Sequence, residues 1–293
     1  MKTPGKIFRE AIVDNNPLMV VGAVNAYCAK MAESAGHKAL YLSGAGVANA
    51  SFGLPDLAIT TLNDVVEDAR RITQATRLPL LTDIDTGFGG AFSISRTIKD
   101  MISADVAAVH IEDQVTQKRC GHRPNKTLVD KIEMSDRIKA AVDGRTDESF
   151  FIMARTDSYA AEGIDGAIDR CNEYISVGAD GLFLEAVSSL EDYKKLKDAL
   201  EVPVLANITE FGKTPLFTAD ELASVGVDIM LFPLSAFRAM NKAAESVYKD
   251  ITANGSQKNS VDKMQTREEL YEYLNYHSFE QKLDELFKRK ENK

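Results

Sequence analysis

A cysteine lies between basic residues and an imidazole in the stretch KRCGH, residues 118–122. The flanking cations, Lys118 among them, and His122 would favour the thiolate form of Cys120 and lower its pKa towards neutral pH. The loop around Gly121 has few apolar residues, so it is a poor candidate for the core. We therefore predict a reactive thiol with a functional role. The alternative is a basic surface turn with an incidental cysteine.

Two carboxylates follow an apolar stretch with one residue between them, at Asp83 and Asp85. Residues two apart on a strand point to the same side, so both carboxylates would face one site. Two like charges at short range raise each other's pKa unless a cation lies nearby. Mg²⁺ suits a site with few carboxylates, completed by water and substrate oxygens. A turn-forming pair without a metal remains the alternative, because this motif alone is weak.

Other charged residues end the later apolar stretches, at Glu112, Arg155 and Glu185. Glu112 could hold a metal-bound water or orient a partner, whereas His110 is better explained as an interior histidine. Arg155 shares a strand face with Asp157 and could clamp a substrate carboxylate through two hydrogen bonds. An internal ion pair between these side chains explains the pattern equally well.

The elements that must position these residues recur along the chain. Eight short stretches are almost continuously apolar, as strands buried on both faces of a parallel sheet are, and helical periodicity separates them. We predict an α/β fold, a (β/α)8 TIM-type barrel, over a single domain of residues 1–293, with a C-terminal helical segment at about 264–290. A doubly wound sheet is the alternative, but no GxGxxG follows the first stretch. The predicted strands are 18–24, 39–44, 78–85, 106–113, 150–156, 181–186, 202–208 and 228–233.

Polar residues follow the apolar part of most of these strands, and the C-terminal mouth of such a barrel is where chemistry takes place. One polar strand end is often only a turn or a helix cap. Many strand ends of the same kind predict an active site.

Composition narrows the classes of partner. The chain has 293 residues and a formal net charge of −9, which argues against nucleic acid and anionic membranes. No stretch is apolar enough to span a bilayer or to act as a secretory signal, so we expect a cytoplasmic protein. The 3 cysteines lack metal or disulfide spacing, and we assign Cys28 and Cys171 to packing within helices.

Several motifs in fixed order resemble the 2-methylisocitrate lyase family, a branch of the isocitrate lyase/phosphoenolpyruvate mutase superfamily. They are KRCGHRPNK (118–126), LTDIDTGFGG (81–90), HIEDQV (110–115), MARTDS (153–158), NITEFGKTPLFT (207–218) and MQTREELYEYLNY (264–276). The resemblance covers residues from about 6 to 290. It implies Mg²⁺-dependent cleavage (Mn²⁺ as a substitute) of 2-methylisocitrate, a small tricarboxylate, to pyruvate and succinate in propionate catabolism. It also implies a homotetramer with exchanged C-terminal helices.

The resemblance further implies roles for individual residues. The family's metal ligands correspond to Asp83 and Asp85, with Asp56 and Glu112 close behind them. From the chemistry of these residues we predict that Cys120 is the proton donor, in a catalytic group with Lys118 and His122, and that residues 113–131 form a lid that closes over substrate. The implied substrate contacts are Ser43, Gly44, Ala45, Cys120, Gly121, Arg155, Glu185, Asn207, Ile208, Thr209, Arg238 and Arg267.

Two points are less direct. The family usually has Ser-Gly-Gly where this chain has Ser43-Gly44-Ala45, and a methyl group there could narrow the approach of the backbone to the substrate. Tyr41 is our first choice for the base that takes the hydroxyl proton, although an ordinary core tyrosine explains it nearly as well. A bound trianion would offset the cations near Cys120 and raise its pKa again.

Other functions remain open. Isocitrate lyase and oxaloacetate hydrolase or decarboxylase activities occur on the same barrel, and the product formed would distinguish them. A catalytically silent barrel that senses a tricarboxylate is the alternative from another class.

Overall fold

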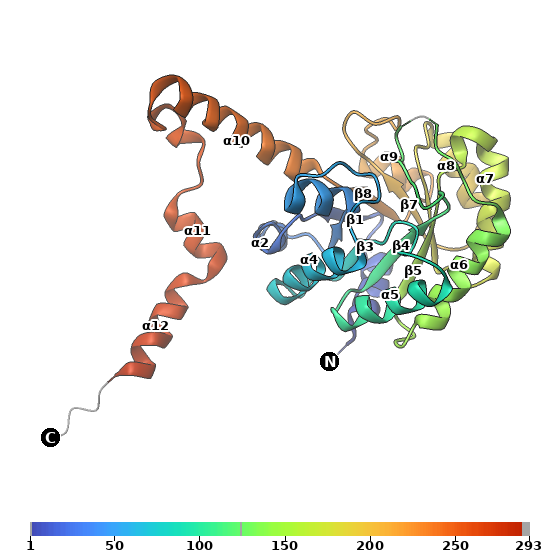
Figure 1. The fold of residues 1–293 in the computed structure, drawn as a ribbon, viewed down its shortest axis with the longest axis horizontal. Coiled ribbons are helices and arrows are strands. Elements are labelled where there is room, and N and C mark those ends of the chain that lie inside the picture. The colour runs from blue at the N-terminus through green and yellow to red at the C-terminus, as the bar shows by residue number, and fades with distance from the viewer. Residues whose placement is uncertain (1, 124, 289–293) are drawn as a thin grey trace. The chain divides into compact units, whose positions relative to one another are not determined.

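The computed structural model describes residues 2–123 and 125–288. In this part of the chain, eight parallel strands form a closed barrel in sequence order, and β8 pairs with β1 (Figure 1). The predicted barrel is confirmed, and each strand lies within its predicted stretch. The strands are β1 (Leu18–Gly22), β2 (Ala39–Leu42), β3 (Leu80–Asp83), β4 (Ala108–Glu112), β5 (Phe151–Thr156), β6 (Gly181–Leu184), β7 (Val204–Asn207) and β8 (Ile229–Phe232).

Helices alternate with the strands along the chain. Around the barrel they are α1 (Pro4–Asp14), α2 (Ala26–Ser34), α3 (Gly44–Gly46), a π-helical turn (Val47–Ser51), α4 (Leu62–Ala75), α5 (Ala91–Ser103), α6 (Lys131–Gly144), α7 (Tyr159–Ser176), α8 (Leu190–Ala199) and α9 (Ala219–Ser224). Capping boxes begin α4 at Thr61 and α9 at Thr218, because the cap hydroxyl and a carboxylate three residues later satisfy free backbone amides.

The described chain divides into two compact units, Met1–Phe237 and Arg238–Lys293. The second unit contains most of α10 (Ser235–Asn254), a 3₁₀ turn (Lys258–Lys263), α11 (Arg267–Leu274) and α12 (Tyr276–Phe287). The predicted helical segment at about 264–290 therefore holds α11 and α12, and its residues 289–290 lie outside the described chain. In the described residues, no helix has the length and apolar character needed to cross a bilayer.

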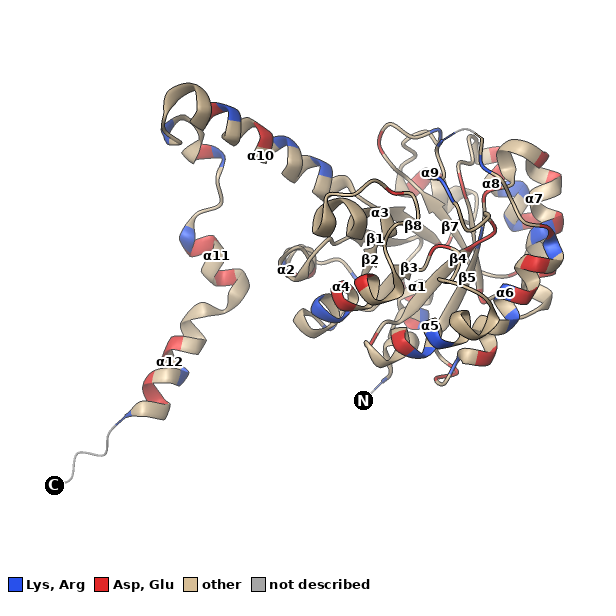
Figure 2. Ribbon diagram, in the orientation of Figure 1, with Lys and Arg blue, Asp and Glu red and all other residues tan. Residues whose placement is uncertain are grey.

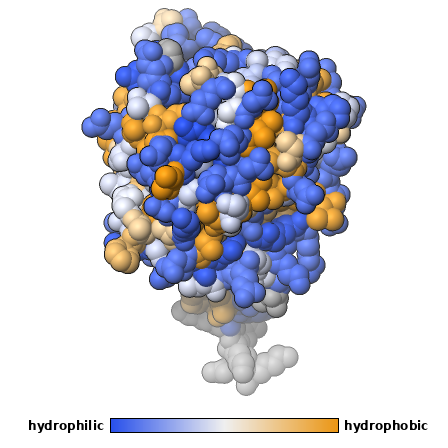
Figure 3. Space-filling view, turned by 90° about the vertical axis from the view of Figure 1, so that its right-hand side faces the viewer, coloured by the Kyte–Doolittle hydropathy of each residue, from blue (hydrophilic) through white to orange (hydrophobic). Residues whose placement is uncertain are grey.

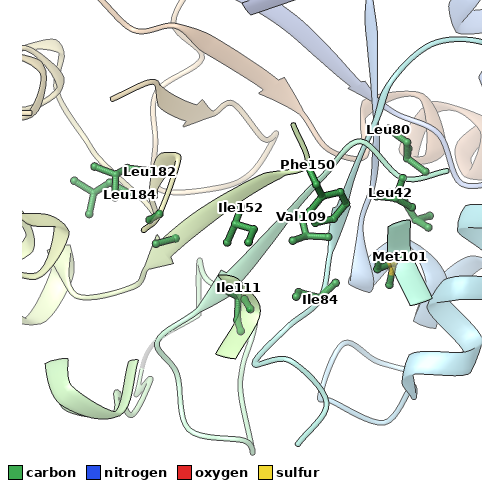
Figure 4. Packing of buried hydrophobic residues seen from close by; sticks show 14 of the residues in the cluster. Leu42, Leu80, Ile84, Met101, Val109, Ile111, Phe150, Ile152, Leu182 and Leu184 are labelled. Atoms are coloured by element: carbon green, nitrogen blue, oxygen red, sulfur yellow. The ribbon is translucent and has the colours of Figure 1, made fainter. Parts of the chain in front are cut away.

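The side chains of each strand alternate between two clusters. Leu80, Val109 and Ile152 belong to the larger cluster, which packs strands against helices (Figure 4). Leu81 and Met153 belong to the smaller cluster, which fills the barrel interior. Since side chains alternate along a strand, the interior face of β5 continues from Met153 to Arg155, and charged residues lie above the apolar interior.

Charged side chains also cover the outside of the molecule. Lys, Arg, Asp and Glu alternate along the outer surfaces of α5, α6 and α7 (Figure 2). The face that carries α7 is mostly hydrophilic, and its apolar residues form small groups (Figure 3). These helices carry charges of both signs, so the charge of the mouth must be worked out from its own residues.

Candidate active site

The barrel register brings charged residues of neighbouring strands side by side. Asp83 of β3 pairs with His110 of β4, and Glu112 pairs with Arg155 of β5. All four residues are buried. Buried charges require partners, so the mouth of the barrel needs a balanced set of cations and anions.

The two predicted metal ligands lie together at the end of β3. The Asp85 amide donates to Asp83 Oδ1 at 3.0 Å, and the Gly44 amide donates to Asp83 Oδ2 at 3.1 Å. A Cβ on Gly44 would lie 3.1 Å from Asp83 Oδ2 and 3.2 Å from Asp85 Oδ1. The first turn of α3 therefore packs directly against both carboxylates, and glycine keeps this approach open.

The two carboxylates ionise differently. Burial disfavours the charge on Asp83, but His110, Lys118 and Arg155 lower its pKa to about 2. Burial and the charge of Asp83 raise the pKa of Asp85 to about 6, despite the opposing effect of Lys118. Asp83 therefore ionises more readily than an ordinary aspartate, and Asp85 less readily.

Hard oxygen donors at this position fit Mg²⁺. No cluster of three or more His, Cys, Asp or Glu side chains with metal-binding geometry occurs among residues 2–123 and 125–288. Within those ranges both Glu112 carboxylate oxygens are buried and accept no hydrogen bond, although Oε2 lies 3.2 Å from Arg155 Nη1. Two aspartates, with Glu112 available to accept hydrogen bonds from bound water, suit an ion that retains several waters.

Arg155 lies at the centre of an internal charge network. Its Nε is 2.9 Å from Asp157 Oδ2. Its Nη1 is 3.2 Å from Glu112 Oε2, and its Nη2 is 3.2 Å from Glu185 Oε2. Burial raises the pKa of Glu112 well above its usual value, while Arg155 and His122 overcome burial and lower that of Glu185. The structure shows the internal ion pair, and the role of Arg155 as a clamp for a substrate carboxylate stays a prediction.

The predicted lid is a loop that runs from residue 113 to residue 130, after which α6 begins. Backbone hydrogen bonds close its base, from Val115 to Thr127 and from Val129 to Asp113. The Gln114 side chain accepts from the amide of Arg119 and donates to its carbonyl group. The lid is therefore a hydrogen-bonded loop, which can hold its side chains in defined positions.

Lys118 lies deep in the mouth, with only 3% of its side chain exposed. Its Nζ is 2.8 Å from Asp85 Oδ1 and also donates to Asp56. Burial alone would lower the Lys118 pKa, but Asp85 and the carboxylates around it outweigh burial and raise that pKa well above its usual value. The lid thus places the Lys118 ammonium group against the predicted metal ligand Asp85, and Asp56 contacts the same ammonium group.

The expected lowering of the Cys120 pKa is wrong for this structure. Burial raises the pKa of the thiol, and the charges of Asp56 and Glu185 add to that effect. Sequence neighbours suggested stabilisation of the thiolate, but the charge of Lys118 is directed to Asp56 and Asp85. Cys120 is therefore a protonated thiol before any substrate binds, so the predicted offset by a trianion is not needed.

His122 connects the lid to two other loops. Its Nδ1 accepts a hydrogen bond from the Lys213 amide at 3.1 Å, so the neutral ring carries its proton on Nε2. That nitrogen lies 3.2 Å from Glu185 Oε1. Asn207 Nδ2 donates to the same carboxylate at 3.3 Å. These contacts fix the orientation of the imidazole between β6 and β7.

Gly121 makes the closest approach of the lid to the barrel. A Cβ at this position would lie 2.4 Å from Arg155 Nη2 and 2.6 Å from Glu185 Oε2. Distances this short are not tolerated, and both neighbours are held by buried ion pairs. A side chain here would therefore separate the lid from the mouth.

Tyr41 and His110 form a buried pair beneath the charged residues. Tyr41 Oη lies 2.9 Å from His110 Nε2, and the two rings stack. Burial, together with Asp83, raises the Tyr41 pKa well above its usual value, and burial lowers that of His110 to about 4. Both groups are neutral near pH 7. The role of Tyr41 as a base stays a prediction, and its burial counts against it.

The remaining predicted residues divide between the two units. Ser43, Gly44, Asn207, Ile208 and Thr209 are buried at strand ends of the first unit, and Ala45 is half-buried beside them. Arg238 and Arg267 are exposed residues of the second unit, and their substrate contacts stay predictions. Cys28 and Cys171 are buried, as predicted.

Lys126 and the backbone of Lys213 were not predicted as parts of the site. Lys126 lies within the KRCGHRPNK motif, so the available signal was a second lysine in the same loop. The amide of Lys213 has no sequence signal, because any residue supplies one.

Comparisons with known proteins agree with this geometry. The family model of phosphoenolpyruvate phosphomutase matches residues 8–252. The 2-methylisocitrate lyases of Vibrio cholerae and Escherichia coli are 60% and 58% identical to the chain; the alignments cover 97% and 100% of it and 94% and 99% of the relatives. A crystal structure of 2,3-dimethylmalate lyase aligns with a TM-score of 0.89 at 34% identity, over 98% of this chain and 96% of that one.

The chain therefore belongs to the isocitrate lyase/phosphoenolpyruvate mutase superfamily and, within it, to the 2-methylisocitrate lyase family. It is an enzyme of the lyase class.

Proposed function

We propose that the protein cleaves 2-methylisocitrate to pyruvate and succinate in a Mg²⁺-dependent reaction of propionate catabolism. The observation that carries this proposal is the meeting of lid and mouth, where Lys118 contacts Asp85 and the lid also carries the protonated thiol of Cys120. The relatives named 2-methylisocitrate lyase support the choice of substrate.

The reaction requires a base for the hydroxyl proton, positive charge to stabilise the developing anions, and an acid to protonate the carbanion. The tertiary hydroxyl loses its proton, the adjacent carbon–carbon bond breaks, and its electron pair remains on the succinate fragment. A Mg²⁺ ion held by Asp83 and Asp85 would polarise the oxygens of the pyruvate half. Lys118 adds positive charge beside it. Cys120 then donates its proton to the carbanion, which completes succinate.

The thiol is suited to this donation because it is protonated near pH 7. His122 and Gly121, on its C-terminal side, fix the lid against Glu185 and Arg155 and so limit the positions available to Cys120. Restricting a proton donor in this way lowers the entropic cost of the transfer.

We further propose that the enzyme assembles as a homotetramer that exchanges its C-terminal helices. Phe279, Leu283, Leu286 and Phe287 of α12 are more than half exposed and recur at helical spacing. In the first unit, a groove of about 350 Å³ beside β1 and β8 has an apolar lining that includes Met19, Leu216 and Met230. Light scattering of the full chain, and of a chain ending before residue 264, tests the assembly. A full chain that is monomeric contradicts it.

Product analysis tests the proposed reaction. The protein is incubated with Mg²⁺ and with 2-methylisocitrate, isocitrate or oxaloacetate, and each keto product is identified. We expect pyruvate from 2-methylisocitrate and loss of turnover in EDTA. Faster formation of glyoxylate from isocitrate would favour an isocitrate lyase, and no product from any acid would favour a silent tricarboxylate sensor.

A further inference from the structure

We propose that Lys126 is a positioning residue that latches the lid closed and thereby keeps Cys120 over the barrel mouth. This inference concerns a residue outside the predicted catalytic, metal and substrate groups. Its effect on turnover rests on the proposed function, whereas its effect on the accessibility of Cys120 does not.

The contacts of Lys126 join two parts of the site. Its Nζ donates at 2.7 Å to the carbonyl oxygen of Gly121 and at 2.7 Å to Asp157 Oδ1. The lysine side chain is 7% exposed and that of Asp157 is fully buried. A buried ammonium group that bridges a carboxylate and a carbonyl group makes strong, charge-assisted hydrogen bonds.

Asp157 is a rigid anchor for this bridge. Arg155 donates to both of its oxygens, from Nε at 2.9 Å and from Nη2 at 3.2 Å. The Asp157 amide donates to Asp113 Oδ1 at 2.9 Å, which fixes the backbone as well. Removal of Lys126 leaves Asp157 paired with Arg155, so the barrel should keep its folded charge network.

The other end of the bridge is the Gly121 carbonyl group, in the lid itself. Gly121 follows Cys120 directly and packs closely against Arg155 and Glu185. The Arg123 amide donates to the Cys120 carbonyl oxygen at 2.9 Å, so residues 120–123 form a turn. By binding the Gly121 carbonyl group, Lys126 fixes that turn, and with it the thiol, relative to β5.

Lys126 differs in this respect from the other lid cation buried in the mouth. Lys118 contacts Asp85, a predicted metal ligand, so substitution of Lys118 would change the charge at the reacting atoms directly. Asp157, the carboxylate partner of Lys126, is assigned to neither the metal nor the substrate. Substitution of Lys126 therefore tests lid closure separately from charge at the reacting atoms.

The experiment measures alkylation of Cys120 by iodoacetamide in the full-length protein, resolved by peptide mass spectrometry. Lys126→Met should react roughly tenfold faster or more than wild type, because two charge-assisted hydrogen bonds to the closed lid are lost. Lys126→Arg should restore much of the protection. The matched control is Lys131→Met. Lys131, at the start of α6, pairs with the exposed Asp169 of α7, so its substitution should leave the rate unchanged.

Cys171, which is buried in the first unit, reports on unfolding in the same sample. Protection of Cys171 together with exposure of Cys120 supports the latch. An unchanged Cys120 rate overturns it, and so does alkylation of both cysteines, because Lys126 would then support the barrel and not the lid. In turnover, Lys126→Met should lower kcat more than it raises KM. If wild type forms no pyruvate but Cys120 still becomes exposed, the proposed function fails and the latch stands.

Discussion

The strand ends and the lid of this protein contribute opposite charges to one site. The strand ends supply buried carboxylates, from Asp83 on β3 to Glu185 after β6, with Arg155 among them. The lid supplies cations, and Lys118 and Lys126 each reach a buried carboxylate. The strand ends thus carry more carboxylates than cations, and the two lysines of the lid pair with two of these carboxylates. We propose that closure of the lid completes the charge balance that the proposed anionic substrate requires.

The strongest test of this comparison removes the lid's proton donor. We expect Cys120→Ser to lose roughly a thousandfold in kcat, the middle of the range for general acid catalysis, and to retain substrate binding. Pyruvate release and calorimetric titration with substrate measure the two effects. Near wild-type turnover in this variant would remove Cys120 from the reaction.

The corresponding test on the strand side is Asp83→Ala. Loss of this carboxylate should weaken both substrate binding and turnover, by about a hundredfold in kcat/KM, because both depend on the metal. Excess Mg²⁺ should restore activity only in part. Titration of activity with Mg²⁺ measures this, and full activity at ordinary Mg²⁺ would contradict the metal assignment.

Gly121→Ala tests the contact between the two regions. The added methyl group would overlap Arg155 and Glu185, and overpacking of this kind costs about 1–3 kcal/mol. We expect kcat to fall and alkylation of Cys120 to accelerate, as both depend on the closed lid. Gly90→Ala is the matched control: its backbone φ is −77°, and a Cβ would meet nothing within 4 Å. Equal behaviour of the two variants would contradict close packing of the lid.

The smallest effect concerns pH. Burial raises the pKa of Cys120 in the folded protein, so the folded state binds this proton more tightly than the unfolded chain does. The resulting stabilisation is present below the ordinary thiol pKa and is lost as the pH rises through the raised value. The alkylation rate, which depends on the thiolate, should therefore still increase above about pH 8.5, the ordinary value for a free thiol. A plateau near pH 7 would show that the cations dominate after all.

Sequence patterns predicted the strand side of the site better than the lid. Almost continuous apolar stretches identified β1 to β8, and the position of Asp83, Glu112 and Arg155 at the ends of these stretches placed them at the mouth. These features depend on local repetition, which a sequence shows directly. The internal partners of Arg155 remained open, since they depend on which strands are neighbours.

The chemistry of the lid depends on residues far away in sequence. The loop KRCGH suggested a thiolate because its cations are adjacent to Cys120, but Asp56 and Asp85 take up the charge of Lys118. Lys126 acquires its role from Asp157, which is 31 positions later. Neither pairing can be found without the fold, so the direction of the Cys120 pKa shift was predicted wrongly.

A crystal structure with Mg²⁺, pyruvate and succinate tests the central claim most directly. The account predicts Mg²⁺ between Asp83 and Asp85, a closed lid, and Cys120 Sγ in contact with a methylene carbon of succinate. Products bound at the mouth with Cys120 directed away from succinate, while Lys118 and Lys126 keep their carboxylate partners, would contradict it.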